Sequence, residues 1–174
     1  MRVTRCAFPV AVLLFLLLVA GCGSGSGGFP TTSPVSDVCS LLKLSEAQSL
    51  VPTVDTFGVE PSPDTPDAWS RICHYSNSQT MGPFTDLDLV IQGALTEKGA
   101  VGLQSVLTTG LGTSHTAVSG VGEQAVFFDE SGSDQGLFAR SRGYMVDVTV
   151  YFANPAVTSQ QLAPLVNAAI SRLP

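Results

Sequence analysis

The stretch YMVDVTVYF, Tyr144 to Phe152, is the clearest β-strand signal in the chain. Valine, threonine, tyrosine and phenylalanine, which favour strands, fill every position except Met145 and Asp147. Asp147 is the only charged residue in the stretch. The composition therefore predicts a strand here, and the flanking segments must supply the rest of a sheet.

Strand and helix patterns recur on both sides of this stretch. Thr85 to Leu95 alternates aspartate with leucine and isoleucine, the period of a half-buried strand. Ser159 to Leu173 repeats apolar residues at steps of three to four, as in an amphipathic helix. The other predicted strands are 69–76, 115–119, 124–129 and 136–140, and the other predicted helices are 37–51 and 98–111.

The predicted order is therefore α-β-β-α-β-β-β-β-α. Strands that follow one another without an intervening helix favour hairpins, and so an α+β fold with an antiparallel sheet and helices packed on one face. A parallel, doubly wound sheet is the alternative, and it would need a helix between most strands.

Local signals set the ends of several elements. Ser45 and Gln48 have the spacing of a capping box in the first helix. Pro164 moves the expected start of the last helix towards Ala163. The Pro/Asp-rich segment 52–66 is predicted to be a loop, and 81–83 a turn between two strands.

The N-terminus has the pattern of a signal peptide, residues 1–21. Arg2 and Arg5 precede an uncharged run that is shorter than the roughly 20 apolar residues of a membrane span. Leu18-Val19-Ala20-Gly21-Cys22 resembles the bacterial lipobox. The resemblance implies cleavage before Cys22 and attachment of diacylglycerol and a further acyl group such as palmitate, because a stable anchor needs more than one chain. The alternative is a secreted protein with a spare Cys22.

A low-complexity segment follows the predicted anchor. Residues 22–36 comprise Cys22 and a stretch built largely from Gly, Ser, Thr and Pro, which predicts a flexible tether. Residues 37–174 are then long enough for one globular domain.

Charge restricts the partners of this domain. The chain has 8 basic and 14 acidic residues, and removal of Arg2 and Arg5 with the leader leaves a net charge near −8. An acidic chain without a basic stripe is not expected to bind nucleic acid. Anionic lipid headgroups would not attract it either, so the acyl chains on Cys22 must provide the membrane attachment.

Lipidation of Cys22 would leave Cys39 and Cys73 as a pair. Outside the cytoplasm, such a pair favours a disulfide, which would close a loop of about 35 residues. A metal site that includes His74 and a redox-active thiol are the alternatives, although no metal-ligand spacing such as CxxC or HExxH accompanies the cysteines.

Motifs for catalysis or cofactor binding are weak. Neither His74 nor His115 lies near a G-x-S-x-G or S-x-x-K motif, and both are expected to be structural. Gly120 to Ala125 fits G-x-G-x-x-A, but a strand pattern follows it, so a tight turn is expected. Asp129 to Asp134 is expected to be a solvated hairpin tip, and Asp86 and Asp88 to lie on a wet sheet face. We predict no catalytic, metal or cofactor site.

The aromatic residues are expected to form the core and cross-strand pairs. They could also line a groove for an acyl chain or a peptide. They are Trp69, Phe127, Phe128, Phe138, Tyr144, Tyr151 and Phe152.

Three motifs together resemble a known family. They are Asp37-Val38-Cys39-Ser40-Leu41-Leu42, Arg71-Ile72-Cys73-His74-Tyr75 and Val118 to Ala125. They are similar to the domain-of-unknown-function 3558 family of actinobacterial lipoproteins. The resemblance implies a surface lipoprotein, an α+β fold and a Cys39–Cys73 disulfide, and it implies no reaction. Lys43-Leu44 departs from the family pattern, which puts the start of the first helix in doubt.

The expected function is that of a lipid-anchored, extracytoplasmic domain that is not an enzyme and that binds an envelope protein or a lipid. The alternative is a lipid or glycolipid carrier with an apolar cavity. A small envelope hydrolase is a third hypothesis, and it would need a histidine beside a nucleophile in a cleft.

Overall fold

The predicted central strand is β7 (Tyr144–Tyr151), and all of its residues except Tyr151 are buried. The computed structural model describes residues 29–79, 85–109, 115–130 and 133–174. The predicted signal peptide, Cys22 and the turn at 81–83 lie outside the described residues. Within those residues, no helix is both long and apolar enough to cross a membrane.

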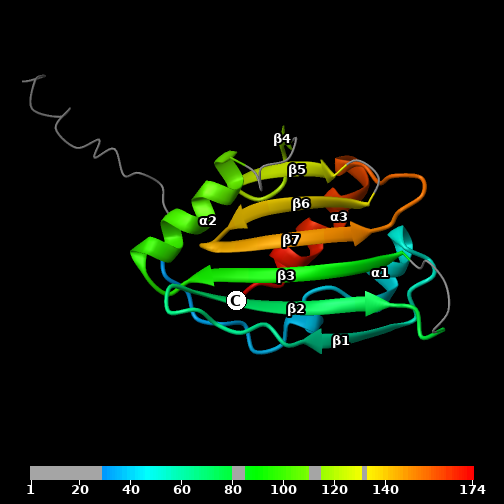
Figure 1. Cartoon of the computed structure of the whole chain (residues 1–174), viewed down its shortest axis with the longest axis horizontal. Helices are drawn as coiled ribbons and strands as arrows, with labels where there is room; N and C mark the ends of the chain where they lie inside the picture. The colour runs from blue at the N-terminus through cyan, green and yellow to red at the C-terminus, as the bar shows by residue number, and fades with distance from the viewer. Residues whose placement is uncertain (1–28, 80–84, 110–114, 131–132) are drawn as a thin grey trace, which may run out of the picture.

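β7 belongs to a seven-stranded sheet of order β1-β2-β3-β7-β6-β5-β4 (Figure 1). All neighbouring pairs are antiparallel, so the predicted α+β class with an antiparallel sheet is confirmed. The other strands are β1 (Thr56–Glu60), β2 (Ala68–Ser76), β3 (Asp86–Ala94), β4 (His115–Val118), β5 (Gln124–Glu130) and β6 (Asp134–Ser141). The helices are η1 (Val38–Ser40), α1 (Leu44–Leu50), α2 (Glu97–Thr109) and α3 (Ser159–Ser171).

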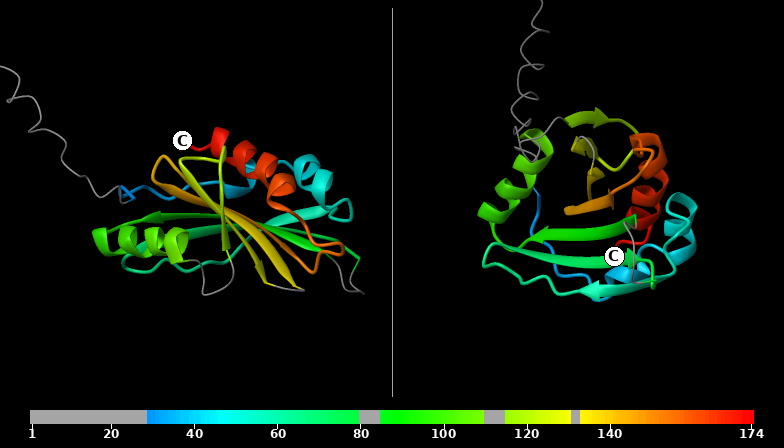
Figure 2. Two further views of the ribbon diagram at one scale, coloured as in Figure 1. Left: turned by 90° about the horizontal axis from the view of Figure 1, so that it is seen from above. Right: turned by 45° about the vertical axis from the view of Figure 1, so that its right-hand side comes forward.

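Helices cover both faces of this sheet. Residues 87, 89, 146, 148 and 150 point to the face covered by η1, α1 and α3, which we call the α3 face. Residues 126, 128, 138 and 145 point to the opposite α2 face, where they pack with α2. Figure 2 shows α1 and α3 on one side of the strands and α2 on the other. The expectation of helices on one face therefore holds for α1 and α3, whereas α2 packs against the second face.

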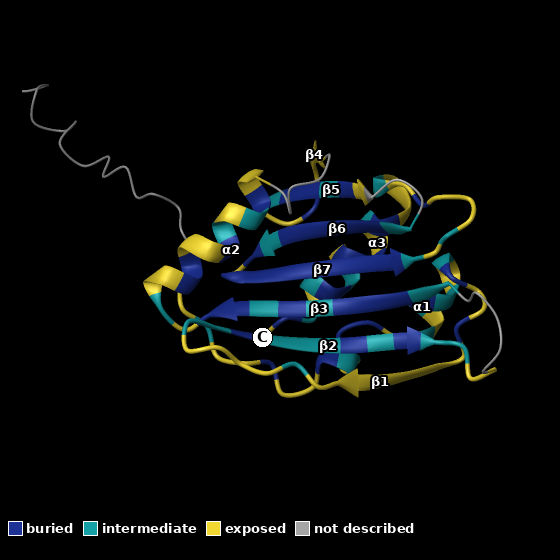
Figure 3. Cartoon of the chain, in the orientation of Figure 1, coloured by how far each residue is buried: buried dark blue, intermediate teal, exposed yellow. Residues whose placement is uncertain are grey.

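One strand was not predicted. β1 lies within 52–66, the segment expected to be a loop, and pairs with β2 at the edge of the sheet. All five of its residues are exposed (Figure 3). Phe57 and Val59 alternate along it, but the proline- and aspartate-rich composition of 52–66 indicated a loop.

Two predicted helix starts also differ. The helix expected over 37–51 is divided into η1 and α1, and the Lys43 N–H donates to Glu46 Oε2 (2.8 Å) where a Ser45–Gln48 box was expected. At the start of α3, Thr158 N–H donates to Gln161 Oε1 (2.9 Å), and Pro164 lies inside the helix. Both starts are set by capping boxes between residues three positions apart.

The chain from Phe29 to Ser36, predicted to be part of the tether, belongs to the fold. Phe29 and Val35 are buried, in the apolar clusters on the α2 and α3 faces respectively. Thr32 holds the segment to the sheet: its N–H donates to the Ala94 carbonyl (2.9 Å), and its carbonyl accepts from Trp69 Nε1 (2.9 Å). The segment passes from one face to the other around the end of β3.

Two strand glycines provide a test of how tightly the α2 face is packed. A Cβ on Gly136 would lie 2.2 Å from the Phe128 ring and 2.6 Å from Thr149 Oγ1, whereas a Cβ on Gly58 of β1 would have no neighbour within 4 Å. We expect Gly136→Ala to lower the free energy of unfolding by about 1–3 kcal/mol, through overpacking. Gly58→Ala is the matched control and should change it little. Equal values in urea denaturation would contradict this packing.

Candidate functional site

The predicted cysteine pair joins η1 to β2. The Sγ atoms of Cys39 and Cys73 lie at disulfide distance, 2.04 Å apart. Cys73 lies in the cluster on the α3 face, whereas the neighbouring His74 points to the α2 face because side chains alternate along a strand. His74 is therefore on the wrong side of β2 to join the two sulfurs in a metal site.

A row of polar side chains crosses the α2 face. His74, Asp88 and Thr149 occupy paired positions on β2, β3 and β7. His74 Nδ1 is 2.6 Å from Asp88 Oδ1, and the Tyr151 hydroxyl donates to Asp88 Oδ2 (3.1 Å). Burial, together with the Asp88 charge, raises the pKa of Tyr151 well above its usual range. Asp86 and Asp88 share this face, as expected, but the wet-face prediction is wrong for Asp88, which is buried and hydrogen-bonded.

Asp147 lies on the α2 face too, two positions before Thr149 on β7. Its side chain accepts a hydrogen bond from Thr149 Oγ1 (2.9 Å), and the residue is only 8% exposed. No ion pair among the described residues involves Asp147. Burial raises the pKa of its carboxyl group to about 8, and the nearby Asp88 charge adds to the shift. Asp147 is therefore mostly protonated at neutral pH.

The strand register gives the cross-strand neighbours of both histidines. It pairs His74 with Gly58 and Asp88, and His115 with Phe128. None of these neighbours is a serine or cysteine, the nucleophiles that a histidine base activates in the hydrolase hypothesis. Among the described residues, no group of three or more His, Cys, Asp or Glu side chains could hold a metal ion.

The glycine motif forms a turn, as predicted. Gly120 and Gly122 have positive φ angles of 79° and 55°, and the chain enters β5 directly afterwards. Glu123 N–H donates to the Arg140 carbonyl (2.8 Å), which fixes the turn to β6. Residues 131–132 of the predicted hairpin tip lie outside the described residues.

The aromatic residues mostly fill the core. Trp69 and Tyr144 meet edge to face on the α3 face, and Phe128 and Phe138 stack with ring centroids 4.8 Å apart on the α2 face. These four rings are buried, whereas Phe152 is exposed.

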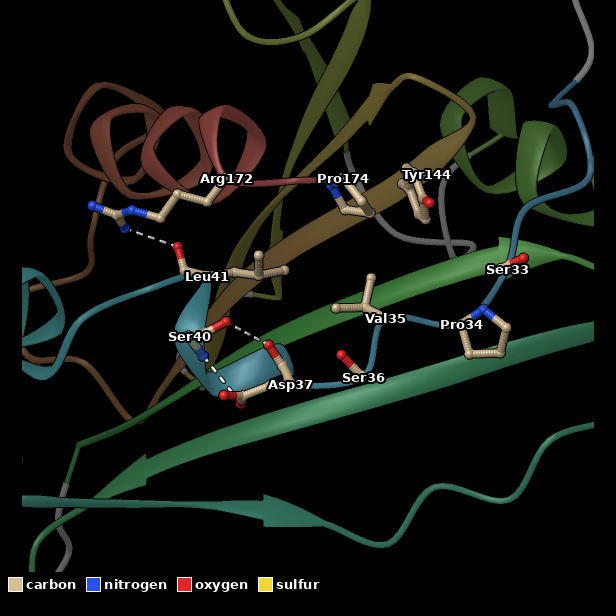
Figure 4. Close-up of a pocket in the computed structure, with 10 residues that line it drawn as sticks. All are labelled: Ser33, Pro34, Val35, Ser36, Asp37, Ser40, Leu41, Tyr144, Arg172 and Pro174. Carbon is tan, nitrogen blue, oxygen red and sulfur yellow. Dashed lines mark hydrogen bonds between the residues drawn. The ribbon is translucent and has the colours of Figure 1, made fainter.

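A groove that the sequence did not reveal lies where the N-terminal segment meets the end of α3 (Figure 4). We call it the N-terminal groove; its volume is about 410 Å³. Val35, Leu41 and Tyr144 provide buried apolar surface, and Ser36 and Asp37 provide exposed polar groups. Its remaining lining residues are Ser33, Pro34, Ser40, Arg172 and Pro174. No short motif could have indicated it, because its walls are more than 100 positions apart in the sequence.

Arg172 fixes one wall of this groove. Its guanidinium donates to the Leu41 carbonyl (2.9 Å) and to both carboxylate oxygens of Glu46 (2.6 and 2.7 Å). This hydrogen bonding lowers the pKa of Glu46 to about 2. The Tyr75 hydroxyl donates to the Leu42 carbonyl from beneath. These contacts fix the Arg172 wall of the groove, and on its rim the Ser40 N–H donates to Asp37 Oδ1 (3.3 Å).

A second hollow of about 350 Å³ lies between the end of α1 and the β7–α3 connection. Apolar residues, including Val51 and Val157, share its lining with Thr53, Asn154 and Gln161. Both hollows therefore present mixed polar and apolar surface.

Comparisons of the chain with known protein families, with curated proteins and with solved structures find no match.

The buried carboxyl of Asp147 makes stability depend on pH. Because its pKa is about 8 when folded and near 3.8 when exposed, the folded state holds a proton that the unfolded chain releases above about pH 4. Stability must then fall as the pH rises from about 4 to 8. Asp147→Asn keeps an acceptor for Thr149, and we expect its stability advantage over the wild type to grow by about 3–4 kcal/mol between pH 4.5 and 7.5.

Denaturation curves at several pH values provide this measurement. Asp86→Asn is the matched control, because Asp86 lies on the same face of the sheet but is less buried. It should leave the pH dependence nearly unchanged. A constant difference between Asp147→Asn and the wild type would contradict the assignment.

Proposed function

We propose that this protein is an extracytoplasmic lipoprotein, held at the cell membrane by acyl chains on Cys22, whose domain binds an envelope ligand or partner without catalysing a reaction. The N-terminal groove is the observation that carries the binding role. It is a hollow of about 410 Å³ with an apolar floor and exposed polar groups, the combination typical of a recognition site.

The groove also lies close to the proposed anchor in the sequence. Ser33, its first lining residue, is eleven positions after Cys22. The groove therefore stays within a short length of chain of the proposed membrane attachment.

A lipid or glycolipid carrier is the alternative. A carrier needs an apolar cavity that encloses its cargo, whereas the N-terminal groove and the second hollow described above are lined in part by serine, threonine, asparagine, glutamine or charged groups. This mixed lining favours recognition at a surface.

We also propose that the chain belongs to the domain-of-unknown-function 3558 family, which it resembles. The disulfide distance between Cys39 and Cys73 supports this membership, since the family resemblance implies that pair. The α+β fold with an antiparallel sheet is a second point of agreement.

The anchor is tested by Cys22→Ser in a bacterial host that processes lipoproteins. We expect the wild type in the membrane fraction with an acylated Cys22 by mass spectrometry, and the variant without acyl mass, because it lacks the thiol that carries diacylglycerol. Unmodified Cys22 in the wild type would contradict the proposal.

The groove is tested by filling it. Ser36→Trp places a large ring in the groove, and Ser119→Trp, at an exposed serine outside its lining, is the control. Native mass spectrometry of gently extracted protein should show a bound species on the wild type and on Ser119→Trp but not on Ser36→Trp. A lipid retained by all three proteins would favour the carrier.

A further inference from the structure

The chain enters the folded domain beside α2. Phe29 is buried in one apolar cluster with Ala100, Leu103 and Leu107 of that helix. The Arg140 guanidinium lies over its ring, 5.6 Å from the centroid. Figure 1 shows the first described residues, in blue, next to α2. Phe29 therefore fixes the point at which the domain is attached to everything that precedes it.

The link from this point to Cys22 is short. Only Gly23 to Gly28 lie between Cys22 and Phe29, whereas the sequence predicted a tether through Ser36. Seven residue steps span at most about 25 Å when fully extended, and a Gly/Ser-rich chain of this length averages about 15 Å. A domain of this size is roughly 40 Å across. An anchored Cys22 therefore keeps the α2 side of the domain near the bilayer and the opposite side away from it.

The surface beside Phe29 suits a lipid interface. Val101, in α2, is 66% exposed, and Leu95, just before α2, is also exposed. Lys98 pairs with Asp67 at 2.6 Å, and Glu97 is the one acidic residue of α2. Partial burial of two apolar side chains at an interface is favourable without basic residues.

From these observations, we infer that the outer side of α2, with Val101 and Leu95, lies against the bilayer surface in the anchored protein. The inference rests on the proposed lipidation of Cys22. It assigns a lipid interface as the partner of these two exposed side chains, and it leaves the α3 face away from the membrane.

Val59 of β1 provides a matched control, because it is a valine of similar exposure (61%) that pairs with Cys73, a residue of the face opposite α2. Val101→Cys and Val59→Cys each add one thiol for an environment-sensitive fluorophore to the full, lipidated protein. The labelled proteins are bound to vesicles of phosphatidylcholine and phosphatidylglycerol, with and without brominated lipid. We expect about half or more of the Val101→Cys fluorescence to be quenched, together with a blue shift, and little quenching of Val59→Cys.

The outcomes separate this inference from the proposed function. Acylated protein that binds vesicles but shows equal quenching at both sites, or quenching at Val59→Cys alone, would overturn the orientation and leave the anchor intact. A blue shift at Val101→Cys without quenching by brominated lipid would mean that protein covers the patch, which also overturns it. Absence of acyl mass on Cys22 would instead overturn the anchor on which the inference rests.

Discussion

The burial of β7 on both faces is the constraint on which the rest of the structure depends. A strand with apolar side chains on one face needs one covering layer, whereas β7 places Val146, Val148 and Val150 on one face and Met145, Asp147 and Thr149 on the other. η1, α1 and α3 cover the first face, and α2 covers part of the second. The remaining part of the α2 face is stabilised by hydrogen bonds between polar side chains, which explains why the row from His74 to Thr149 lies there.

The burial of both faces of the sheet also explains the path of residues 29–36. Phe29 completes the apolar cluster under α2, and Val35 completes the cluster under α3, so the segment must cross from one face to the other. Its hydrogen bonds to Ala94 and Trp69 fix that crossing. Because residues 29–36, predicted to be tether, are packed in the domain, they form one wall of the N-terminal groove and leave only a short link to Cys22. The shape of the groove and the length of the link to Cys22 therefore depend on the burial of Phe29 and Val35 rather than on a sequence motif.

The polar residues show where sequence reasoning reaches its limit. Alternation in Asp86 to Ile91 correctly predicted that Asp86 and Asp88 share a face, since this depends only on strand geometry. It could not show that Asp88 meets His74 and Tyr151, because those contacts depend on which strands are neighbours. Asp147 was visible as one charge in an apolar stretch, but its raised pKa comes from burial that no local pattern reports. β1 was missed for another reason: Phe57 and Val59 alternate along it, but the surrounding prolines and aspartates indicated a loop.

The sequence predicted the elements whose side chains alternate or repeat, the α+β class and the turn at Gly120 to Gly122, because each depends on local geometry. It predicted the Cys39–Cys73 pair from the number of cysteines that remain after Cys22. The lipobox-like stretch before Cys22 is likewise legible only in the sequence. Tertiary structure alone decided that α2 packs on the face opposite α3, that residues 29–36 are folded, and that Val35, Tyr144 and Arg172 line one groove. These features arise from contacts between segments far apart in the chain, where the free energy of burial, rather than local propensity, selects the arrangement.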